Sequence, residues 1–134
     1  MQVAGAVIKN QQGEFLLQLR DGKVSRFKNC WTLFGGRIEG NEKPQEALLR
    51  ELNEELNLVL SDIESMREIQ RGQDADGVPF FIYEVLINKT IDQLTLCEGA
   101  AMKYVSKRQL FDHAFAFNTE EILRKYVQTM TEDS

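Results

Sequence analysis

The stretch that decides the fold runs Gly36-Arg-Ile-Glu-Gly-Asn-Glu42 and, seven residues later, Arg50-Glu51-Leu52-Asn53-Glu54-Glu55-Leu56-Asn57-Leu58. Within it, Glu51, Glu54 and Glu55 lie at i, i+3 and i+4, so an α-helix places all three on one face. Like charges on one face repel each other unless a positive group lies between them. A hard divalent cation with oxygen ligands is such a group, so the spacing predicts a metal site.

The same acids could instead form a charged, solvated face of a surface helix, which is a common arrangement. Two features favour the metal site. Arg50 lies beside the acids, with Glu42 eight residues upstream of it. The pair Gly35-Gly36 directly follows an apolar run, and glycines in such a loop allow the backbone to approach a ligand closely.

The spacing of these residues resembles the signature of the Nudix hydrolases. That signature reads Gly, five residues, Glu, seven residues, Arg-Glu, an aliphatic residue, any residue, Glu-Glu, any residue, Gly and an aliphatic residue. The matching positions here are Gly36, Glu42, Arg50, Glu51, Leu52, Glu54, Glu55 and Leu58. So many fixed positions make the resemblance specific.

Two positions depart from the family pattern. Asn57 stands where the family has glycine, and asparagine is the next most tolerant residue of the left-handed conformation that closes many helices. We therefore expect the turn to be kept. Phe34 replaces the proline that usually precedes the two glycines, which alters local stiffness and removes no metal ligand.

The resemblance implies an α/β (α+β) fold, an α/β/α sandwich around a mixed sheet, and cleavage of a diphosphate linkage in a nucleoside diphosphate derivative by attack of water at phosphorus. It implies a Mg²⁺ or Mn²⁺ cofactor, since oxygen ligands suit both ions. The implied metal ligands are Glu51, Glu54, Glu55 and the carbonyl of Gly36, with Arg50 orienting Glu51, and with Glu42 and Gly35 supporting the site. The family leaves the general base open between Glu51 and Glu54.

A fifth acid, Glu98, precedes Gly99 and the expected strand 103–105. In the family, a late loop of this kind supplies an additional metal ligand or base in many members. Without that context, Glu98 would be interpreted as an acid of a surface loop. We include it among the candidate metal ligands.

Asn118 is the main candidate for substrate recognition. It lies where similar proteins of the MutT type place an asparagine that reads the nucleobase, and an amide can match the donor and acceptor edges of a purine. Because Thr119-Glu120-Glu121 follows it, Asn118 could equally be the N-cap of a helix. Both interpretations stay open at this stage.

Other side chains could contact a nucleotide. Phe80, Phe81 and Tyr83 could stack on a base, although aromatics that alternate in a strand more often belong to the core. Arg20, Arg26 and Arg37 are candidate phosphate contacts or, equally, solvated surface charges. Of these, Arg37 is the best placed in the sequence, next to Gly36.

Composition predicts one compact domain spanning residues 1–134. Hydrophobic residues make up 43% of the chain, no apolar run reaches the roughly 20 residues that cross a bilayer, and the N-terminus has no signal-peptide pattern. With only Cys30 and Cys97, a reducing cytoplasmic setting is expected. A net charge of −5 argues against a general nucleic-acid surface, so we expect a small nucleotide derivative as partner.

The expected strands are 3–8, 14–19, 31–34, 59–70, 78–87 and 103–105. The expected helices are one from Pro44, a short one capped by Ser106 that runs through Phe111, and one from Thr119 to Val127. Ala47, Leu48, Leu49, Leu52 and Leu56 should form the buried stripe of the first helix, with the acids pointing elsewhere. Asp74-Ala-Asp76-Gly77 is a hairpin turn, because its glycine comes too early for a calcium loop.

Three functions are compatible with the sequence. The first is hydrolysis of a nucleoside triphosphate, including an oxidised one, to monophosphate and pyrophosphate. The second is the same chemistry on a nucleotide sugar or dinucleoside polyphosphate. The third is a non-catalytic Nudix module that binds a ligand, which is disfavoured because Glu51, Glu54 and Glu55 are all present.

Overall fold

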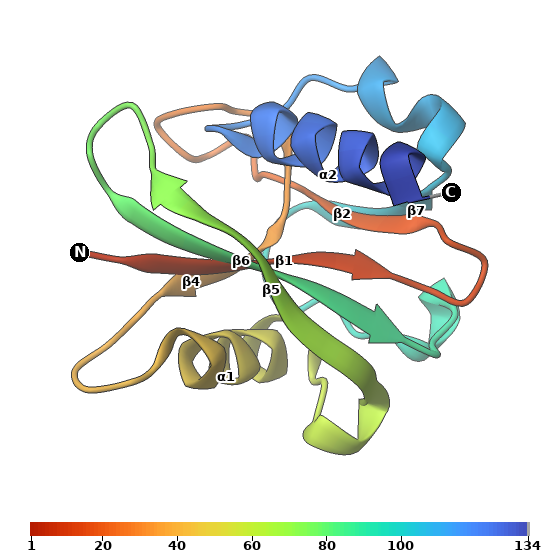
Figure 1. Ribbon diagram of the computed structural model, residues 1–134, viewed down its shortest axis with the longest axis horizontal. Helices are drawn as coiled ribbons and strands as arrows, with labels where there is room; N and C mark the ends of the chain where they lie inside the picture. The colour runs from red at the N-terminus through yellow and green to blue at the C-terminus, as the bar shows by residue number, and fades with distance from the viewer. Residues whose placement is uncertain (134) are drawn as a thin grey trace.

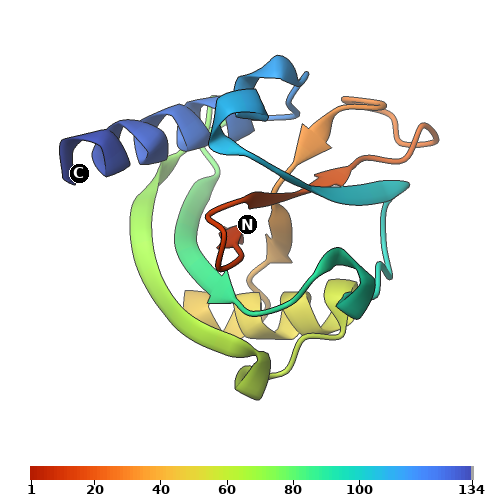
Figure 2. The same cartoon turned by 90° about the vertical axis from the view of Figure 1, so that its right-hand side faces the viewer.

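A mixed β-sheet lies between two helices in the computed structural model, which describes residues 1–133, with side chains through residue 130. The strands are β1 (Val3–Lys9), β2 (Phe15–Leu19), β3 (Trp31–Thr32), β4 (Phe34–Arg37), β5 (Ile63–Gln73), β6 (Pro79–Ile87) and β7 (Ala101–Val105). The helices are α1 (Pro44–Leu56) and α2 (Thr119–Asp133), with 3₁₀ turns η1 (Leu60–Asp62), η2 (Ile91–Gln93) and η3 (Lys107–Asp112). Figures 1 and 2 show α1 and α2 on opposite faces of the sheet, which confirms the predicted sandwich.

The sheet has the order β3-β2-β1-β6-β5, with β4 added to β1 and β7 added to β2. The β1–β6 pair is parallel and the other pairs are antiparallel. One edge of β1 is shared by two partners, because its first half pairs with β4 and its last two residues pair with β2. The strands β2 and β4 therefore diverge from one point on β1, and the space between them becomes the cavity described below.

Each face of the sheet packs against one helix. The core on the α1 side includes the fully buried side chains of Phe34, Leu48 and Leu52, whereas the core on the α2 side includes Phe15 and Leu123. Burying side chains of this size contributes roughly 1.5–3 kcal/mol each before conformational entropy is counted. The two cores fix α1 and α2 on the sheet and thereby fix what their polar side chains face.

Helix α1 begins and ends as its sequence predicts. Pro44 occupies the first turn, where a missing N–H is harmless, and the carboxylate of Glu46 accepts a hydrogen bond of 2.8 Å from the backbone N–H of Lys43. Asn57 closes the helix in the left-handed conformation, with φ of 57°. The prediction that asparagine keeps this turn in place of glycine is confirmed.

The buried stripe of α1 differs from the prediction. Glu55 is buried, with 4% of its surface exposed, while Leu49 is only partly buried. The helix meets the sheet with Glu55 turned toward β4, where the backbone N–H of Gly35 donates a hydrogen bond of 2.9 Å to its carboxylate. An acid in the buried stripe was not expected, because periodicity alone assigns charged residues to the solvent.

The two glycines also differ from the prediction, since they belong to strand β4 and not to a loop. Gly35 pairs with Gly5, and Gly36 pairs with Ala4, in an antiparallel ladder. A Cβ atom on Gly35 would lie 2.2 Å from the carbonyl oxygen of Ala4, and φ of Gly35 is 145°. Only glycine permits this close strand pairing.

Several boundaries also shift. The predicted strand 59–70 begins only at Ile63, because residues 60–62 form η1. The predicted strand 31–34 is divided between β3 and β4, and the helix expected after Ser106 is the 3₁₀ turn η3. The predicted turn at 74–77 is confirmed, since the N–H of Asp74 donates to the carbonyl of Val78. Among the described residues, no helix is long and apolar enough to cross a membrane.

Candidate functional site

A cavity of about 710 Å³ opens where β2 and β4 diverge, and this volume lies within the range of small-molecule sites. Its polar lining residues come from distant parts of the chain. They are Gln18, Arg20, Asp21, Thr32, Glu51, Glu55, Asp74, Glu98, Asn118 and Thr119. The apolar lining includes Phe80, Ile82, Phe117 and Ile122. The cavity therefore has an acidic end near α1 and a mixed end near the start of α2.

Arg50 holds the acids of α1 together. Its Nε and Nη2 donate to both carboxylate oxygens of Glu42, at 2.8 and 3.0 Å, and Nη2 also donates to the carbonyl of Arg37 at 2.9 Å. Its Nη1 donates to Glu51 at 3.0 Å and lies 3.4 Å from Glu54. These bonds raise the pKa of Arg50 and lower that of Glu42, so the Glu42–Arg50 pair stays charged and orients Glu51.

Glu55 lies deepest at the acidic end. Burial raises the pKa of its carboxyl to about 8; the hydrogen bond from Gly35 opposes this, and the charges of Glu98, Glu51 and Glu54 add to it. Burial likewise raises the pKa of Glu51, against the hydrogen bond from Arg50. Two neighbouring carboxyl groups with raised pKa values are typical of a site that binds a positively charged group.

Gly36 makes room for Glu51. A Cβ atom at position 36 would lie 2.4 Å from the carboxylate carbon of Glu51, which is too close for any side chain. The backbone of Gly36 and the carboxylate of Glu51 are therefore in direct contact. This contact explains why glycine is needed at a position where φ itself imposes no such need.

The loop that carries Glu98 is tied to this end of the cavity by three hydrogen bonds, two between backbone groups and one from a side chain. The N–H of Cys97 donates to the carbonyl of Glu55 at 2.8 Å, and the N–H of Ala100 donates to Leu19. The side-chain amide of Gln18 donates to the backbone carbonyl of Glu98 at 2.9 Å. Glu98 is exposed to solvent, yet its charge raises the pKa of both Glu51 and Glu55.

The donor set fits a hard divalent cation. Glu51, Glu55 and Glu98 offer carboxylate oxygens around one end of the cavity, which are the ligands that Mg²⁺ and Mn²⁺ prefer. Within the part of the chain that the structure describes, no three His, Cys, Asp or Glu side chains are yet close enough together to hold a metal ion. In this conformation Arg50 donates to Oε1 of Glu51 and lies 3.4 Å from Glu54.

Not every predicted residue reaches the cavity. Glu54 does not line it, and 57% of its side chain is exposed. The side chain of Arg37 is exposed, and only its carbonyl contributes, to Arg50. Arg26 does not line the cavity either, whereas Arg20 does. The prediction that Arg37 is the best placed arginine for a phosphate contact was therefore wrong. It relied on the proximity of Arg37 to Gly36, but adjacent residues of a strand point to opposite faces.

The mixed end of the cavity carries Asn118. Its carbonyl accepts the first helical hydrogen bond of α2, from Ile122 at 3.1 Å, and its side chain lines the cavity. Within the described residues, no hydrogen bond involves the Asn118 side-chain amide. The capping position is thus real, but the side chain does not cap, and the amide is available to a ligand.

Of the three aromatic residues that could stack on a base, only Phe80 lines the cavity. Tyr83 is buried in the core on the α1 side, and Phe81 packs there beneath the guanidinium of Arg71. Sequence reasoning missed Phe117 and Gln18, which both line the cavity. Phe117 is next to Asn118, so its neighbour could have drawn attention to it, whereas no sequence signal points to Gln18.

The fold is a mixed sheet between two helices, with a cavity that carries Glu51, Glu55 and Glu98 at one end. The family model for the NUDIX domain matches residues 1–126. The chain is 31% identical over 111 residues to an 8-oxo-dGTP diphosphatase of Haemophilus influenzae, a match that covers 82% of this chain and 79% of that protein. It is also 31% identical over 110 residues to an RNA pyrophosphohydrolase of Cellvibrio japonicus, covering 82% of this chain and 58% of that relative.

Solved structures agree on the fold. A structure from a study of MutT of Aliivibrio salmonicida and Vibrio cholerae has a TM-score of 0.77 at 20% identity, covering 96% of this chain and 97% of that one. The NUDIX domain of NrtR from Shewanella oneidensis, solved with ADP ribose, has a TM-score of 0.77 at 19% identity, covering 97% and 88%. The chain belongs to the Nudix family and is a hydrolase of phosphoanhydride bonds.

Proposed function

We propose that this protein is a metal-dependent pyrophosphohydrolase, one domain over residues 1–134, that converts a nucleoside triphosphate to monophosphate and pyrophosphate. The observation that carries the proposal is the polarity of the cavity. Glu51, Glu55 and Glu98 lie at one end, and Asn118 with Phe80 lies at the other. Such a site suits a ligand that is anionic at one end and planar and partly apolar at the other.

The resemblance to the family suggests the roles of the residues. Mg²⁺ or Mn²⁺, held by Glu51, Glu54, Glu55, Glu98 and the carbonyl of Gly36, would neutralise charge on the phosphate oxygens and activate water. Arg50 orients Glu51 and is itself fixed by Glu42. Between the two candidate bases, the cavity favours Glu51, because Glu54 does not line it. Asn118 would match the edge of the base.

The nature of the base is suggested by similarity. The relative from Haemophilus influenzae is named for 8-oxo-dGTP, and the match covers most of both chains. We therefore place oxidised guanine nucleotides among the first substrates to test. Cys30 and Cys97 are both free, which agrees with a reducing compartment such as the cytoplasm.

Product analysis tests this proposal. The protein is assayed with Mg²⁺, and then with a chelator, on nucleoside triphosphates, 8-oxo-dGTP, nucleotide sugars and dinucleoside polyphosphates. Pyrophosphate and a monophosphate from one triphosphate, lost with the chelator, support it. Turnover only of sugars or dinucleotides would move the function to those substrates. A folded protein that is inactive on the whole panel would contradict the enzymatic assignment of this site.

Glu54→Gln and Glu51→Gln separate the two candidate bases. Both variants keep the size of the side chain and remove its charge. If Glu51 is the base, its variant should lose the dependence of turnover on pH that the wild type shows on the acid side, while Glu54→Gln lowers turnover and keeps that dependence. The reverse result would assign the base to Glu54.

A further inference from the structure

Within the described residues, the first turn of helix α2 has no hydrogen bond from the side chain at its capping position. Asn118 occupies that position and accepts a hydrogen bond from the N–H of Ile122 through its backbone carbonyl, while its side chain lines the cavity. A capping side chain would satisfy one of the free N–H groups of this turn. The first turn must therefore be held in place by contacts from other elements.

The residue before Asn118 adds to this need. Phe117 has φ of 55°, in the left-handed region that bulky residues rarely adopt. Phe117 is also 52% exposed, so burial does not explain the conformation. A strained backbone of this kind persists only where the surrounding structure fixes it. The start of α2 therefore depends on its neighbours in space.

Two polar side chains of the sheet hold the first turn of α2. The hydroxyls of Thr32 on β3 and Thr119 on α2 share a hydrogen bond of 3.2 Å, and Thr119 is buried. From β5, Nε2 of Gln70 donates to the carbonyl of Ile122 at 3.0 Å. Figures 1 and 2 show the end of β5 next to α2. The peptide groups of Ile122 are thus bonded on one side to Asn118 and on the other to Gln70.

Gln70 reaches α2 because of a β-bulge in β5. Glu68 pairs with Tyr83 and Gln70 pairs with Ile82, so Ile69 is an extra residue in the strand. In a regular strand, Gln70 would lie on the same face as Glu68. The partner of Glu68 belongs to the core on the α1 side, whereas the partner of Gln70 belongs to the core on the α2 side. The bulge therefore turns Gln70 toward α2.

The middle of α2 is held by contacts that do not involve Gln70. Leu123 is fully buried in the core on the α2 side, and Tyr126 donates a hydrogen bond to Glu84. Packing of the helix on the sheet is therefore secured elsewhere. Since Ile122 lines the cavity, the contact from Gln70 acts on the turn that forms the mixed end of the cavity.

We propose that Gln70 is a positioning residue that holds the carbonyl of Ile122, fixes the first turn of α2 and so keeps the side-chain amide of Asn118 directed at the base of the substrate. The inference rests on the proposed function and adds a residue that does not line the cavity. An amide that is fixed before the ligand arrives distinguishes bases better than a mobile one, because its donor and acceptor positions are set in advance.

Amide hydrogen exchange, followed by NMR, tests whether Gln70 holds the turn. Gln70→Leu removes the donor, and Gln70→Glu keeps the size of the side chain but offers a carboxylate that cannot donate. In both variants the amide of Ile122 should exchange about fivefold faster, whereas amides after Tyr126 should keep their rates. The matched control is Gln11→Leu, which removes the hydrogen bond of another glutamine to β5, at Glu64, and should leave the exchange of Ile122 unchanged.

Calorimetry with Mg²⁺ tests the effect on base recognition. The probes are dGMP and dTMP, which carry the same sugar and phosphate, so the ratio of their Kd values reports the base alone. In Gln70→Leu this ratio should move toward one by about fivefold, and Asn118→Ala should remove the preference. In the Asn118→Ala background, Gln70→Leu should change the ratio no further, because Gln70 acts through Asn118.

The positioning role is refuted if Gln70→Leu leaves the exchange of Ile122 unchanged, or if the wild type binds both nucleotides equally or not at all. It is also refuted if Gln70→Leu still changes the ratio without Asn118, or lowers the melting temperature and leaves the ratio unchanged. Hydrolysis of triphosphates is measured separately. A protein that shows the expected exchange and ratio but hydrolyses no triphosphate contradicts the proposed reaction and retains the positioning role.

Discussion

Two buried glutamates on opposite sides of the sheet have opposite electrostatic environments. Glu55 on α1 is 4% exposed, and Glu84 on β6 is 9% exposed. Burial raises the pKa of Glu55 to about 8. Burial also opposes ionisation of Glu84, but hydrogen bonds from Tyr126 and Arg67 outweigh it and hold the pKa of Glu84 below its usual value. Two carboxyls with little solvent exposure therefore have pKa values shifted in opposite directions, upward at Glu55 and downward at Glu84.

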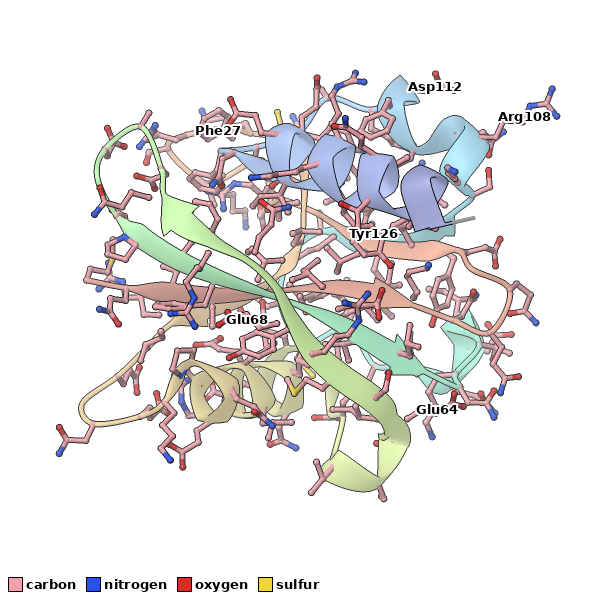
Figure 3. All side chains as sticks on the ribbon, viewed as in Figure 1. Phe27, Glu64, Glu68, Arg108, Asp112 and Tyr126 are labelled. Carbon is pink, nitrogen blue, oxygen red and sulfur yellow. The ribbon has the colours of Figure 1, made fainter. Side chains whose placement is uncertain are left out.

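The partners explain the difference. Glu84 accepts hydrogen bonds from Tyr126, which points from α2 toward the sheet in Figure 3, and from Arg67 at 3.0 Å. The ammonium of Lys9 also lies near, 3.2 Å from the Tyr126 hydroxyl. Glu55 has one N–H from Gly35 and otherwise faces other acids. A buried carboxylate that accepts several hydrogen bonds stabilises the packing of a helix on the sheet. A buried carboxyl with few donors is suited to bind a cation.

Replacing Glu55 should have the largest effect. Glu55→Gln keeps the hydrogen bond from Gly35 and removes the charge that a cation needs. We expect turnover to fall by about 1,000-fold, or about 4 kcal/mol, because a catalytic metal contributes several kcal/mol to the transition state. Steady-state kinetics with Mg²⁺ measures this. The melting temperature with chelator should stay equal or rise, and a large drop instead would make Glu55 structural, like Glu84.

Removing Glu84 should act on stability and not on chemistry. Glu84→Ala leaves the Tyr126 hydroxyl and Lys9 without their buried partner, so the free energy of unfolding should fall by about 3 kcal/mol. Chemical denaturation measures the loss. Since Glu84 lies on the α2 side and does not line the cavity, KM should stay within about twofold, a change well below the tenfold that corresponds to 1.4 kcal/mol. A raised KM with unchanged stability would reverse the assignment.

The contributions of Glu55 and Glu84 to folding stability should change with pH in opposite directions. The larger change is expected for Glu55. Its pKa is raised in the folded state, so its contribution to stability is fully present below the unfolded pKa, about 4.5, and is lost as pH rises through about 8. With chelator, unfolding free energy should therefore decline over this window more steeply in the wild type than in Glu55→Gln. Mg²⁺ affinity should increase over the same window, because ligation releases the proton. Parallel curves for both proteins would contradict the raised pKa.

The smallest effect expected is the loss of the Glu84 contribution to folding stability at acidic pH. Its pKa is lowered in the folded state, so its contribution to stability is present above the unfolded value near 4.5 and is lost as pH falls through the folded pKa. Acid unfolding of Glu84→Gln should consequently be shallower than that of the wild type below pH 4.5. Acid unfolding is followed by circular dichroism. If the curves of the wild type and Glu84→Gln are identical below pH 4.5, Tyr126 and Arg67 do not stabilise the Glu84 anion.

The ends of α1 were predictable from the local sequence. Pro44 and Asn57 bound α1 where expected, because helix ends are set by backbone conformations that single residues prefer. The strand order, the burial of Glu55 and the placement of Gly35 in β4 were not predictable in this way. They depend on which strand lies beside another, as when Gly35 packs on Ala4 across the ladder.

For the site, the sequence by itself determined the acids of α1 and the arginine among them, because their spacing on one helix is a local property. Only the tertiary structure decided that Arg20 lines the cavity and Arg37 does not, and that the guanidinium of Arg20 lies 4.7 Å from the centroid of the Phe117 ring. The tertiary structure also sets the directions of two pKa shifts, upward for Glu55 and downward for Glu84. Burial and partners come from residues far apart in the chain, and a carboxyl's charge depends on those surroundings more than on its neighbours in sequence.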